Sequence, residues 1–373
     1  MTHLDDSQSH HLLINLSFLS VRPTGISTYA TNLFPYLKPL NPTLLVSQSH
    51  ADYHCYPVPP NFTPDQGSKG HFQRLLWTQL QLPRIYQKLR SAVSSRASRS
   101  PLLFSPLPEA PLFTNCRYIV TVHDLIPLRF PRRGSPLTIY CRYYIPQVLA
   151  QAQHILCDSV ATAKDITDFF QISIDKITPV LLAYDTQHFR FLDLPTSNYF
   201  LYIGRHDPYK NLPRLIDAFA ALPTGNDYEL WIAGPPDRRY TPILQAQADH
   251  RGLTHRVKFL DYVPYEQLPI IINQAIALVF PSLWEGFGLP VLEAMACGTP
   301  VITSNLSSLP EVAGDAALLI NPYNTGEITE AMQAVATDSI LRSRLRTLGL
   351  NRASQFSWAK TGQATVEVLQ RYL

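Results

Sequence analysis

The sequence predicts an α/β protein of two domains, spanning residues 1–190 and 191–356. Its 373 residues exceed the length that one hydrophobic core usually organises, so two domains are the default expectation. Short apolar runs, each followed by a glycine-bearing loop and a helical segment, recur in both halves. Unbroken apolar runs are typical of parallel strands that are buried on both faces by helices.

The composition is that of an ordinary globular chain and counts against several functional classes. Hydrophobic residues make up 46% and charged residues 16% of the chain, which excludes a disordered protein. The net charge of +3 is too small to indicate a nucleic-acid partner. The five cysteines are scattered without metal-ligand spacing, so a reduced, cytoplasmic compartment is expected. Asp5 and Asp6 lie where a secretion signal would be basic, so no signal peptide is expected.

In the first half, strands are expected at residues 12–19, 102–105, 118–122, 155–157 and 177–184. A helix that ends near Leu37, before Pro39, follows the first strand, with Gly25 at the turn. This turn lacks the G-x-G-x-x-G pattern of dinucleotide-binding proteins, which counts against a dehydrogenase. Ser159 is expected to cap a helix after the fourth strand. Residues 190–197 are the expected linker to the second half.

In the second half, strands are expected at residues 199–203, 229–234, 256–259, 275–280 and 301–303. Helices are expected at residues 212–221, from Pro290 to Gly298, across the amphipathic run 328–348, and at 357–373. Proline is common at the first position of a helix, and glycine followed by proline commonly ends one.

Residues 279–300 organise the second half. A buried strand, a loop with Gly286 and Gly288, and a helix N-terminus present backbone N–H groups and a positive dipole end, which favour an anion such as phosphate. Glu285 and Glu293, eight positions apart, can face one ligand from two sides. Carboxylates accept hydrogen bonds from sugar and ribose hydroxyls, so the combination indicates a nucleotide sugar. The alternative is an ordinary strand-to-helix turn with two solvated glutamates.

Two cations lie on the loop after the strand expected at residues 199–203. Arg205 and Lys210 are five positions apart. At the end of a strand, Arg can hold a diphosphate by forked hydrogen bonds and Lys can do so as a point charge. On the residue pattern alone, both are equally compatible with solvated surface charges.

His123 follows a β-rich run and precedes Asp124, so a titratable pair is expected at the carboxyl end of a strand. Ligand sites of α/β proteins lie at such ends. A lone histidine is more often structural, and the residue pattern alone leaves both interpretations open.

Residues 66–108 contain no acidic residue and seven basic ones. The seven are Lys69, Arg74, Arg84, Lys88, Arg90, Arg96 and Arg99. Aromatic and aliphatic residues alternate with them in the pattern of an amphipathic helical segment that is interrupted at Pro83. One interpretation is a helix with a core-facing apolar side and a solvated basic side. The other is docking on an anionic membrane surface, close to a lipid-linked acceptor.

The run E-G-F-G-L-P-V-L-E at residues 285–293 closely resembles the E-x7-E element of retaining glycosyltransferases of family 4, which have the GT-B fold. The loop at residues 204–211 is similar to the G-R-x4-K-N signature of that family, and the turns at Gly25 and His123 also resemble it. The resemblance covers nearly the whole chain. It implies two Rossmann-like domains facing across a cleft, with the C-terminal helix at residues 357–373 crossing back to the first domain.

The resemblance also implies roles for the matching residues. The implied catalytic residues are His123, Arg205, Lys210 and Glu285. The implied donor-binding residues are Gly25, Gly204, Val263, Gly286, Phe287, Gly288, Leu289, Pro290, Val291 and Glu293. The first glutamate and the glycine-loop amides would meet the donor sugar, the second glutamate the ribose, and the two cations the pyrophosphate. The histidine would reach the sugar from the opposite domain, and the loop around residue 263 would lie beside the base. Residues 309–318 would form a supporting turn and strand.

The implied reaction is retaining transfer of a hexose from a nucleotide-diphosphate sugar to a glycan or lipid-linked acceptor. Residues 74–77 and 104–106 resemble the mannosyltransferase branch of bacterial surface-polysaccharide enzymes, which favours mannose. No D-x-D metal signature lies at a strand end, so neither a metal nor a cofactor is expected. The cations and the helix N-terminus at residues 289–291 would then offset the leaving-group charge. The expected location is the cytoplasm, peripherally on the inner face of the membrane. The alternatives are another GT-B enzyme (a nucleotide-sugar epimerase or a phosphorylase) and a non-catalytic nucleotide-sugar-binding module.

Overall fold

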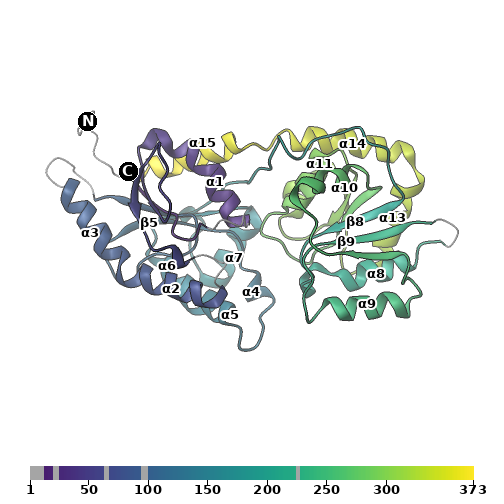
Figure 1. Ribbon diagram of the computed structural model, residues 1–373, viewed down its shortest axis with the longest axis horizontal. Helices are drawn as coiled ribbons and strands as arrows, with labels where there is room; N and C mark the ends of the chain where they lie inside the picture. The colour runs from purple at the N-terminus through teal and green to yellow at the C-terminus, as the bar shows by residue number, and fades with distance from the viewer. Residues whose placement is uncertain (1–11, 20–24, 63–66, 94–99, 224–226) are drawn as a thin grey trace. The chain divides into compact units, whose positions relative to one another are not determined.

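The computed structural model describes residues 12–19, 25–62, 67–93, 100–223 and 227–373. The chain divides into two compact units (Figure 1), of which unit 1 comprises residues 1–181 and 358–373 and unit 2 comprises residues 182–357.

The boundary between the units lies earlier than the expected one at residues 190 and 191. The segment before the expected boundary packs on unit 2, which explains the difference. The His188 ring stacks on Tyr265 with 3.7 Å between centroids, and Asn273 Nδ2 donates to the Arg190 carbonyl at 3.0 Å. The C-terminal residues 358–373 belong to unit 1, as the resemblance implied.

Unit 1 is built on a seven-stranded parallel sheet of order β3-β2-β1-β4-β5-β6-β7. Its strands are β1 (Leu12–Asn15), β2 (Thr43–Val46), β3 (His54–Pro57), β4 (Leu102–Ser105), β5 (Arg117–Val122), β6 (His154–Cys157) and β7 (Ile177–Pro179). β1, β2 and β4 are buried along their whole length, as their apolar sequences predict. β1 is shorter than expected because the chain turns after it, with Leu19 N donating to Leu16 O at 3.1 Å.

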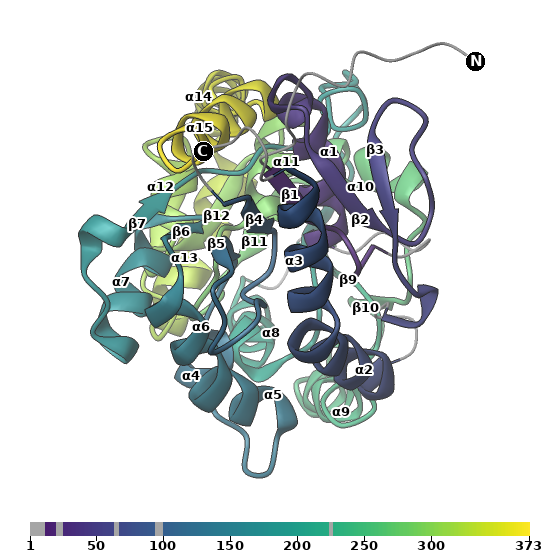
Figure 2. The same cartoon turned by 90° about the vertical axis from the view of Figure 1, so that its left-hand side faces the viewer.

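Helices cover both faces of this sheet. They are α1 (Gly25–Leu37), α2 (Gly67–Leu80), α3 (Leu82–Val93), α4 (Ile126–Arg129), α5 (Pro136–Ile139), α6 (Ile145–Gln151), α7 (Val160–Phe170) and α15 (Trp358–Gln370). Shorter turns are η1 (Lys38–Leu40), η2 (Pro60–Phe62), η5 (Ile174–Lys176) and the π-helical η4 (Tyr140–Tyr144), which joins α5 to α6. Two views show α1 and α15 on one side of the sheet and α2 and α6 on the other (Figures 1 and 2). The expected cap of α7 is confirmed, because Ser159 Oγ accepts from Thr162 N at 3.1 Å.

The basic segment differs from the expectation in one respect. The break expected at Pro83 separates α2 from α3, but Arg74 is a buried residue and not a solvated one. Its guanidinium donates to Glu109 Oε1 and Oε2, each at 2.7 Å, so the charge is neutralised inside the unit. Arg96 and Arg99 lie outside the described residues.

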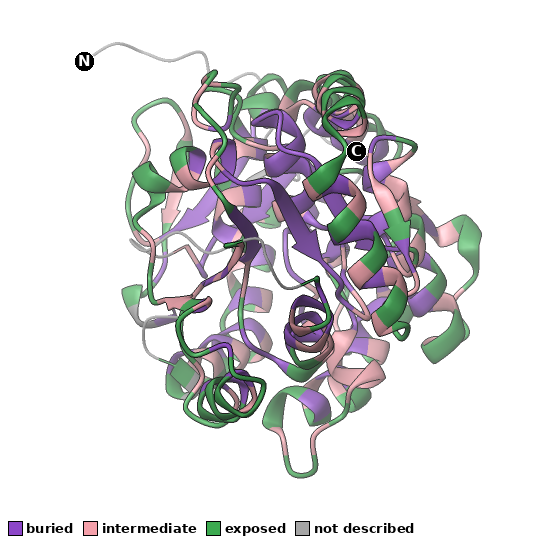
Figure 3. Ribbon diagram, turned by 90° about the vertical axis from the view of Figure 1, so that its right-hand side faces the viewer, coloured by how far each residue is buried: buried purple, intermediate pink, exposed green. Residues whose placement is uncertain are grey.

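Unit 2 is built on a six-stranded parallel sheet of order β10-β9-β8-β11-β12-β13. Its strands are β8 (Tyr199–Ile203), β9 (Glu229–Ala233), β10 (Val257–Leu260), β11 (Ala277–Phe280), β12 (Val301–Ser304) and β13 (Leu318–Ile320). The two central strands, β8 and β11, are largely or fully buried, and burial falls toward the outer surfaces of the helices (Figure 3).

The helices of unit 2 are α8 (Leu212–Ala220), α9 (Thr241–His250), α10 (Leu268–Asn273), α11 (Leu289–Ala296), α12 (Leu309–Ala313), α13 (Thr325–Thr337) and α14 (Ser339–Ala353), with the short turns η6 (Pro208–Lys210) and η7 (Tyr265–Gln267). The amphipathic run 328–348 is therefore two helices. Asp338 divides them, because its Oδ1 accepts from Ile340 N and Leu341 N, each at 2.9 Å, and so starts α14. The turn expected after residue 309 is the helix α12, and β13 follows it. None of the described helices is both long and apolar enough to cross a bilayer.

Candidate functional site

The predicted donor-binding residues of unit 2 lie mainly on two neighbouring loops. β8 and β11 are adjacent at the centre of the sheet, and the chain order reverses between them. Open α/β sheets bind ligands at the carboxyl ends of the strands that flank such a reversal. The loop after β8 carries Gly204, Arg205 and Lys210, and the loop after β11 carries residues 285–288.

Hydrogen bonds hold these two loops together. Leu283 N donates to the Tyr209 carbonyl at 2.8 Å. Asn211 Nδ2 donates to the carbonyls of Pro281 and Pro322 at 3.1 and 2.6 Å. Asn211 adopts a left-handed backbone with φ 64°, a conformation that asparagine tolerates better than most residues. This side chain therefore sets the spacing between the two loops.

Lys210 and Glu285 form an ion pair across the two loops. Lys210 Nζ lies 2.6 Å from Glu285 Oε1 and 2.9 Å from Oε2. The side chains are only 12% and 10% exposed, so both charges are largely removed from water. An ammonium group has three protons, and two of them are used by the carboxylate. One proton is left to donate to a ligand.

Two serines after β12 position the Glu285 loop. Glu285 N donates to Ser307 Oγ at 3.0 Å. The Ser308 hydroxyl donates to the Phe287 carbonyl at 2.6 Å and lies 3.0 Å from the Glu285 carbonyl. The sequence analysis did not identify these serines. Their position just beyond β12, the strand next to β11, is the feature that could have identified them.

The helix α11 begins where the sequence predicts, at residues 289 and 290. Gly288, before it, has φ 121°, and a Cβ there would lie 2.8 Å from Leu309 Cδ2, so glycine is required. Pro290 has no N–H, and the Val291 N–H donates to the Gly288 carbonyl at 3.0 Å. The positive potential expected at residues 289–291 therefore comes from the helix dipole and not from amide donors at these two positions.

Glu293 lies one turn into α11 and is partly buried. Burial and the nearby charge of Asp185 raise the pKa of Glu293 to about 7. Asp185 Oδ2 in turn lies 3.4 Å from the Tyr265 hydroxyl. Asp185 was not identified from the sequence, since it falls in the segment that was assigned to the first domain.

Among the charged residues of the predicted site in unit 2, Arg205 is the most exposed. Its Nε lies 3.1 Å from Asp207 Oδ2, and its side chain is 69% exposed. The guanidinium is largely solvated although its partner Asp207 is only 5% exposed, so Arg205 can turn to a ligand without leaving water. A pocket of about 350 Å³ is lined by Arg205, His206, Asp207, Pro235, Pro236 and Asp237, between the loops after β8 and β9.

In unit 1, His123 lies at the carboxyl end of β5 and is held at both ring nitrogens. Nδ1 lies 2.8 Å from Asp158 Oδ2, and Nε2 lies 3.0 Å from the Pro106 carbonyl oxygen. The Pro106 carbonyl and an ionised Asp158 carboxylate both accept hydrogen bonds, an arrangement that favours the charged form of the His123 ring. Burial lowers the pKa of His123, but the charge and hydrogen bond of Asp158 outweigh burial and raise the pKa.

Asp158, which no motif in the sequence marks, is the partner of His123 in unit 1. It directly follows β6, the strand next to β5, just as His123 follows β5. Polar residues after neighbouring parallel strands meet at one edge of a sheet, and this signal could have identified the pair.

Two predicted donor-binding residues, Gly25 and Val263, lie on other elements. Gly25 begins α1 in unit 1, directly after residues 20–24, which lie outside the described residues. Val263 is partly buried on the loop after β10, which is separated from β8 by β9. The structure therefore brings together residues 204–210 and 285–293 and places Val263 on a more distant loop.

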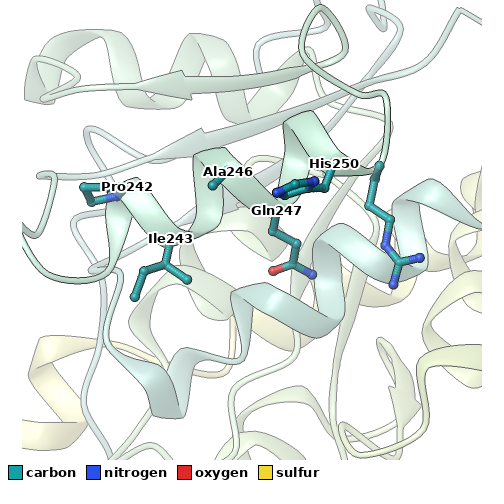
Figure 4. Close-up of a pocket in the computed structure, with 6 residues that line it drawn as sticks. Pro242, Ile243, Ala246, Gln247 and His250 are labelled. Carbon is teal, nitrogen blue, oxygen red and sulfur yellow. The ribbon is translucent and has the colours of Figure 1, made fainter.

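A second hollow, of about 680 Å³, lies along α9 (Figure 4) and contains none of the predicted residues. It is lined by Pro242, Ile243, Ala246, Gln247, His250 and Arg251. The Gln247 amide already donates to the Pro213 carbonyl and to Asp217, so we assign the hollow no role in binding. Among the residues that the structure describes, no group of three or more His, Cys, Asp and Glu side chains could hold a metal ion. Reaction without a metal stays a prediction.

The known proteins that the chain resembles are glycosyltransferases. The family described as glycosyl transferases group 1 matches residues 184–352. Over 265 residues the chain is 32% identical to O-antigen chain mannosyltransferase B of Escherichia coli, covering 67% of this chain and 69% of that one. Over 320 residues it is 28% identical to O-antigen chain mannosyltransferase RfbU of Salmonella typhimurium, covering 83% and 87%.

A solved structure of Anabaena HepE in complex with UDP and glucose has the same fold. Its TM-score is 0.72 at 17% identity, and the match covers 97% of this chain and 100% of that one. The two Rossmann-like units and the C-terminal helix that belongs to unit 1 confirm the GT-B fold that the sequence resemblance implied.

Proposed function

Because the chain belongs to the group 1 glycosyltransferases and is a hexosyltransferase, we propose that it transfers mannose from a nucleotide-diphosphate sugar to a glycan or lipid-linked acceptor. The names of two relatives, both O-antigen chain mannosyltransferases, support mannose. A nucleotide-diphosphate donor is supported by the structural neighbour that holds UDP. Family membership excludes the non-catalytic binding module, and it favours transfer over the epimerase and phosphorylase alternatives.

The Lys210–Glu285 pair is the observation that carries this proposal. When the glycosidic bond breaks, the departing diphosphate gains negative charge and the sugar gains positive charge. The remaining ammonium proton of Lys210 would meet a phosphate oxygen, and the Glu285 carboxylate would lie on the sugar side. One desolvated pair would thus stabilise both ends of the breaking bond. Preorganised groups of this kind contribute roughly 3 kcal/mol each to a transition state.

The other site residues would complete the donor site. Arg205 would turn from Asp207 to the diphosphate, and ionised Glu293 would accept hydrogen bonds from the ribose hydroxyls. His123 would exchange its hydrogen bond to the Pro106 carbonyl for one to a hydroxyl of the transferring sugar, while Asp158 holds the other ring nitrogen. We further propose retention of the anomeric configuration and catalysis without a metal ion. A lipid-linked acceptor would bring the enzyme to the cytoplasmic face of a membrane.

A donor screen followed by a transfer assay tests the proposal. Purified protein is heated with nucleotide-diphosphate mannose and with the corresponding glucose compounds, because a ligand that binds only the folded state raises Tm. We expect a mannose donor to raise Tm, and we expect nucleoside diphosphate release to require an acceptor glycan. NMR of the product should show the anomeric configuration of the donor. A chain that no donor stabilises, or that consumes a donor with free phosphate in place of a glycan, would overturn the proposal.

A further inference from the structure

The helix α2 has an apolar outer face. Phe72, Leu76 and Leu80 are 61%, 45% and 59% exposed. Their spacing of four residues aligns them along one side of the helix. Large apolar side chains in such a stripe are uncommon on the free surface of a monomeric protein.

The inner face of α2 is polar in places where a core-facing helix is normally apolar. Arg74 and Thr78 are buried on this face, 6% and 0% exposed. Arg74 is anchored by Glu109 and by the Phe62 carbonyl, to which it donates at 3.0 Å. The usual arrangement of a surface helix, apolar inside and polar outside, is therefore partly reversed. Rotating α2 to hide the stripe would break the buried Arg74–Glu109 pair, so the apolar side stays outward.

A second exposed apolar group lies on the neighbouring α5 and η4. Leu137, Ile139 and Tyr143 are 52%, 53% and 62% exposed. Two contacts place η4 beside α2: Gln79 Nε2 donates to the Tyr144 hydroxyl at 2.9 Å, and the rings of His71 and Tyr140 are 5.1 Å apart. We define the apolar face by the three residues of the α2 stripe, Phe72, Leu76 and Leu80.

Cations accompany the apolar face, whereas acids are absent from its main segment. Residues 67–93 contain no Asp or Glu. The exposed cations of α2, α3, η4 and the loop before α5 are Lys69, Arg84, Lys88, Arg90, Arg133 and Arg142. Exposed apolar anchors next to a field of positive charge are the two features that bind a protein to the surface of an anionic bilayer.

We propose that the apolar face docks unit 1 on an anionic lipid bilayer, with its three side chains in the interface and the cations against lipid headgroups. A second copy of the chain fits less well, because a symmetric dimer through this face would bring like-charged segments together. The inference deepens the proposed membrane location by naming the surface that would hold the protein there, and lipid binding through this face needs neither donor nor acceptor.

Vesicle co-sedimentation with a matched control tests the apolar part. The variant Phe72→Ser/Leu76→Ser/Leu80→Ser is compared with Ile243→Ser/Ile340→Ser, which changes side chains of unit 2 that are 62% and 81% exposed. We expect the wild type and the control to sediment with phosphatidylcholine vesicles that contain phosphatidylglycerol. The triple variant should lose partition by about a hundredfold, given the apolar surface it removes. A triple variant that binds as the wild type does would overturn the proposal.

Charge reversal tests the ionic part and does not depend on the apolar variant. Arg84→Glu/Lys88→Glu should lower partition onto the anionic vesicles on the order of tenfold, while Arg344→Glu/Lys360→Glu should not. Added salt should weaken wild-type binding. All variants should keep the donor-induced rise in Tm, which separates a failure of docking from a failure of the proposed function. Absence of wild-type binding to the anionic vesicles would overturn the inference. If the wild type instead formed a concentration-dependent dimer that the triple variant does not form, the apolar face would be a dimer interface and the inference would be wrong.

Discussion

Lys210 and Glu285 are joined before any donor binds, and this changes how substitutions at either residue are interpreted. Removing one partner of a largely buried ion pair leaves the other charge desolvated, at a cost of about 3–5 kcal/mol. Lys210→Ala would therefore lose activity through a missing charge and also through a destabilised loop. A single substitution cannot separate these effects, but replacing both partners can.

We predict that Lys210→Met lowers the free energy of unfolding by about 3 kcal/mol and that Lys210→Met/Glu285→Gln recovers most of this loss. Neither variant should transfer hexose, because both lack the ammonium proton proposed to meet the phosphate. Urea unfolding and a transfer assay measure the two quantities. The control Lys258→Met/Glu229→Gln removes a more exposed pair, 2.6 Å apart, and should remain close to the wild type in both. Wild-type turnover by the Met/Gln double variant would refute the assigned role.

Glu293 links the pH dependence of stability to that of donor binding. Its pKa is about 7 in the folded chain against an ordinary 4.5, so between these values the folded form holds a proton that the unfolded form has released. Stability therefore falls as pH rises through this window and stays lower above it. Donor affinity should change in the opposite sense, because the ionised carboxylate is the better acceptor for ribose hydroxyls.

We predict that Glu293→Gln raises the free energy of unfolding by about 1–3 kcal/mol above pH 7, with little effect below pH 4.5. The same variant should bind donor weakly at every pH, whereas wild-type affinity should increase as pH passes 7. Urea unfolding across pH and calorimetric donor titration test both statements. A variant less stable than the wild type in alkaline buffer would show that the carboxylate is stabilising and not strained.

The helix α15 approaches α1 closely enough that one glycine sets their separation. A Cβ on Gly362 would lie 2.5 Å from Tyr36 Cβ, which no packing can accommodate without movement. Two further bonds fix the end of this segment: Tyr372 OH pairs with His154 Nδ1 at 3.0 Å, and the Tyr372 carbonyl accepts from Arg117 at 2.5 Å. The C-terminal segment is thus an integral part of unit 1.

We predict that Gly362→Ala destabilises the protein by about 1–3 kcal/mol. The sign is informative, because an alanine in place of glycine in a helix interior would otherwise stabilise by about 0.5–1 kcal/mol. Gln363→Ala, at an exposed neighbouring position, is the control and should change stability by less than about 0.5 kcal/mol. Tyr36→Gly should relieve the overlap in a double variant, because it removes the Tyr36 Cβ. A stabilised Gly362→Ala protein in thermal unfolding would mean that the two helices are not packed this closely.

The sequence predicted strands more accurately than helix orientation. β4 and β8 have the expected bounds, since their apolar runs are continuous and buried on both faces. The division between α13 and α14 was missed because neither Gly nor Pro marks it, and Asp338 acts only through its cap. The outward turn of α2 was not predictable from its own residues, because Glu109, the partner that buries Arg74, lies 35 positions away.

Across the whole molecule, motifs marked the charged residues of the predicted site but not the residues that hold them. Arg205, Lys210 and Glu285 are separated in sequence, yet each stood out by its place in a recognisable loop. Asp158 and Ser307 have no motif of their own, and they act through a hydrogen bond to a residue far away in the chain. The charged residues and the residues that hold them meet because they follow neighbouring strands. Which strands are neighbours follows from the strand order, which was known only from the structure.

The charge balance of the donor site leads to a last prediction. Lys210 is paired with Glu285 and could meet the diphosphate with its remaining proton, whereas Arg205 would have to exchange Asp207 for the diphosphate. The Arg205 side chain is 69% exposed, which favours this exchange although Asp207 is only 5% exposed. We predict that transfer continues in EDTA, that Arg205→Gln lowers kcat/KM about a hundredfold, and that Mg²⁺ does not restore it. Arg344→Gln, at an exposed position on α14, should keep wild-type turnover. Activity that disappears in EDTA and returns with Mg²⁺ would mean that the site carboxylates bind a metal. Protein cations alone would then not offset the negative charge of the departing diphosphate.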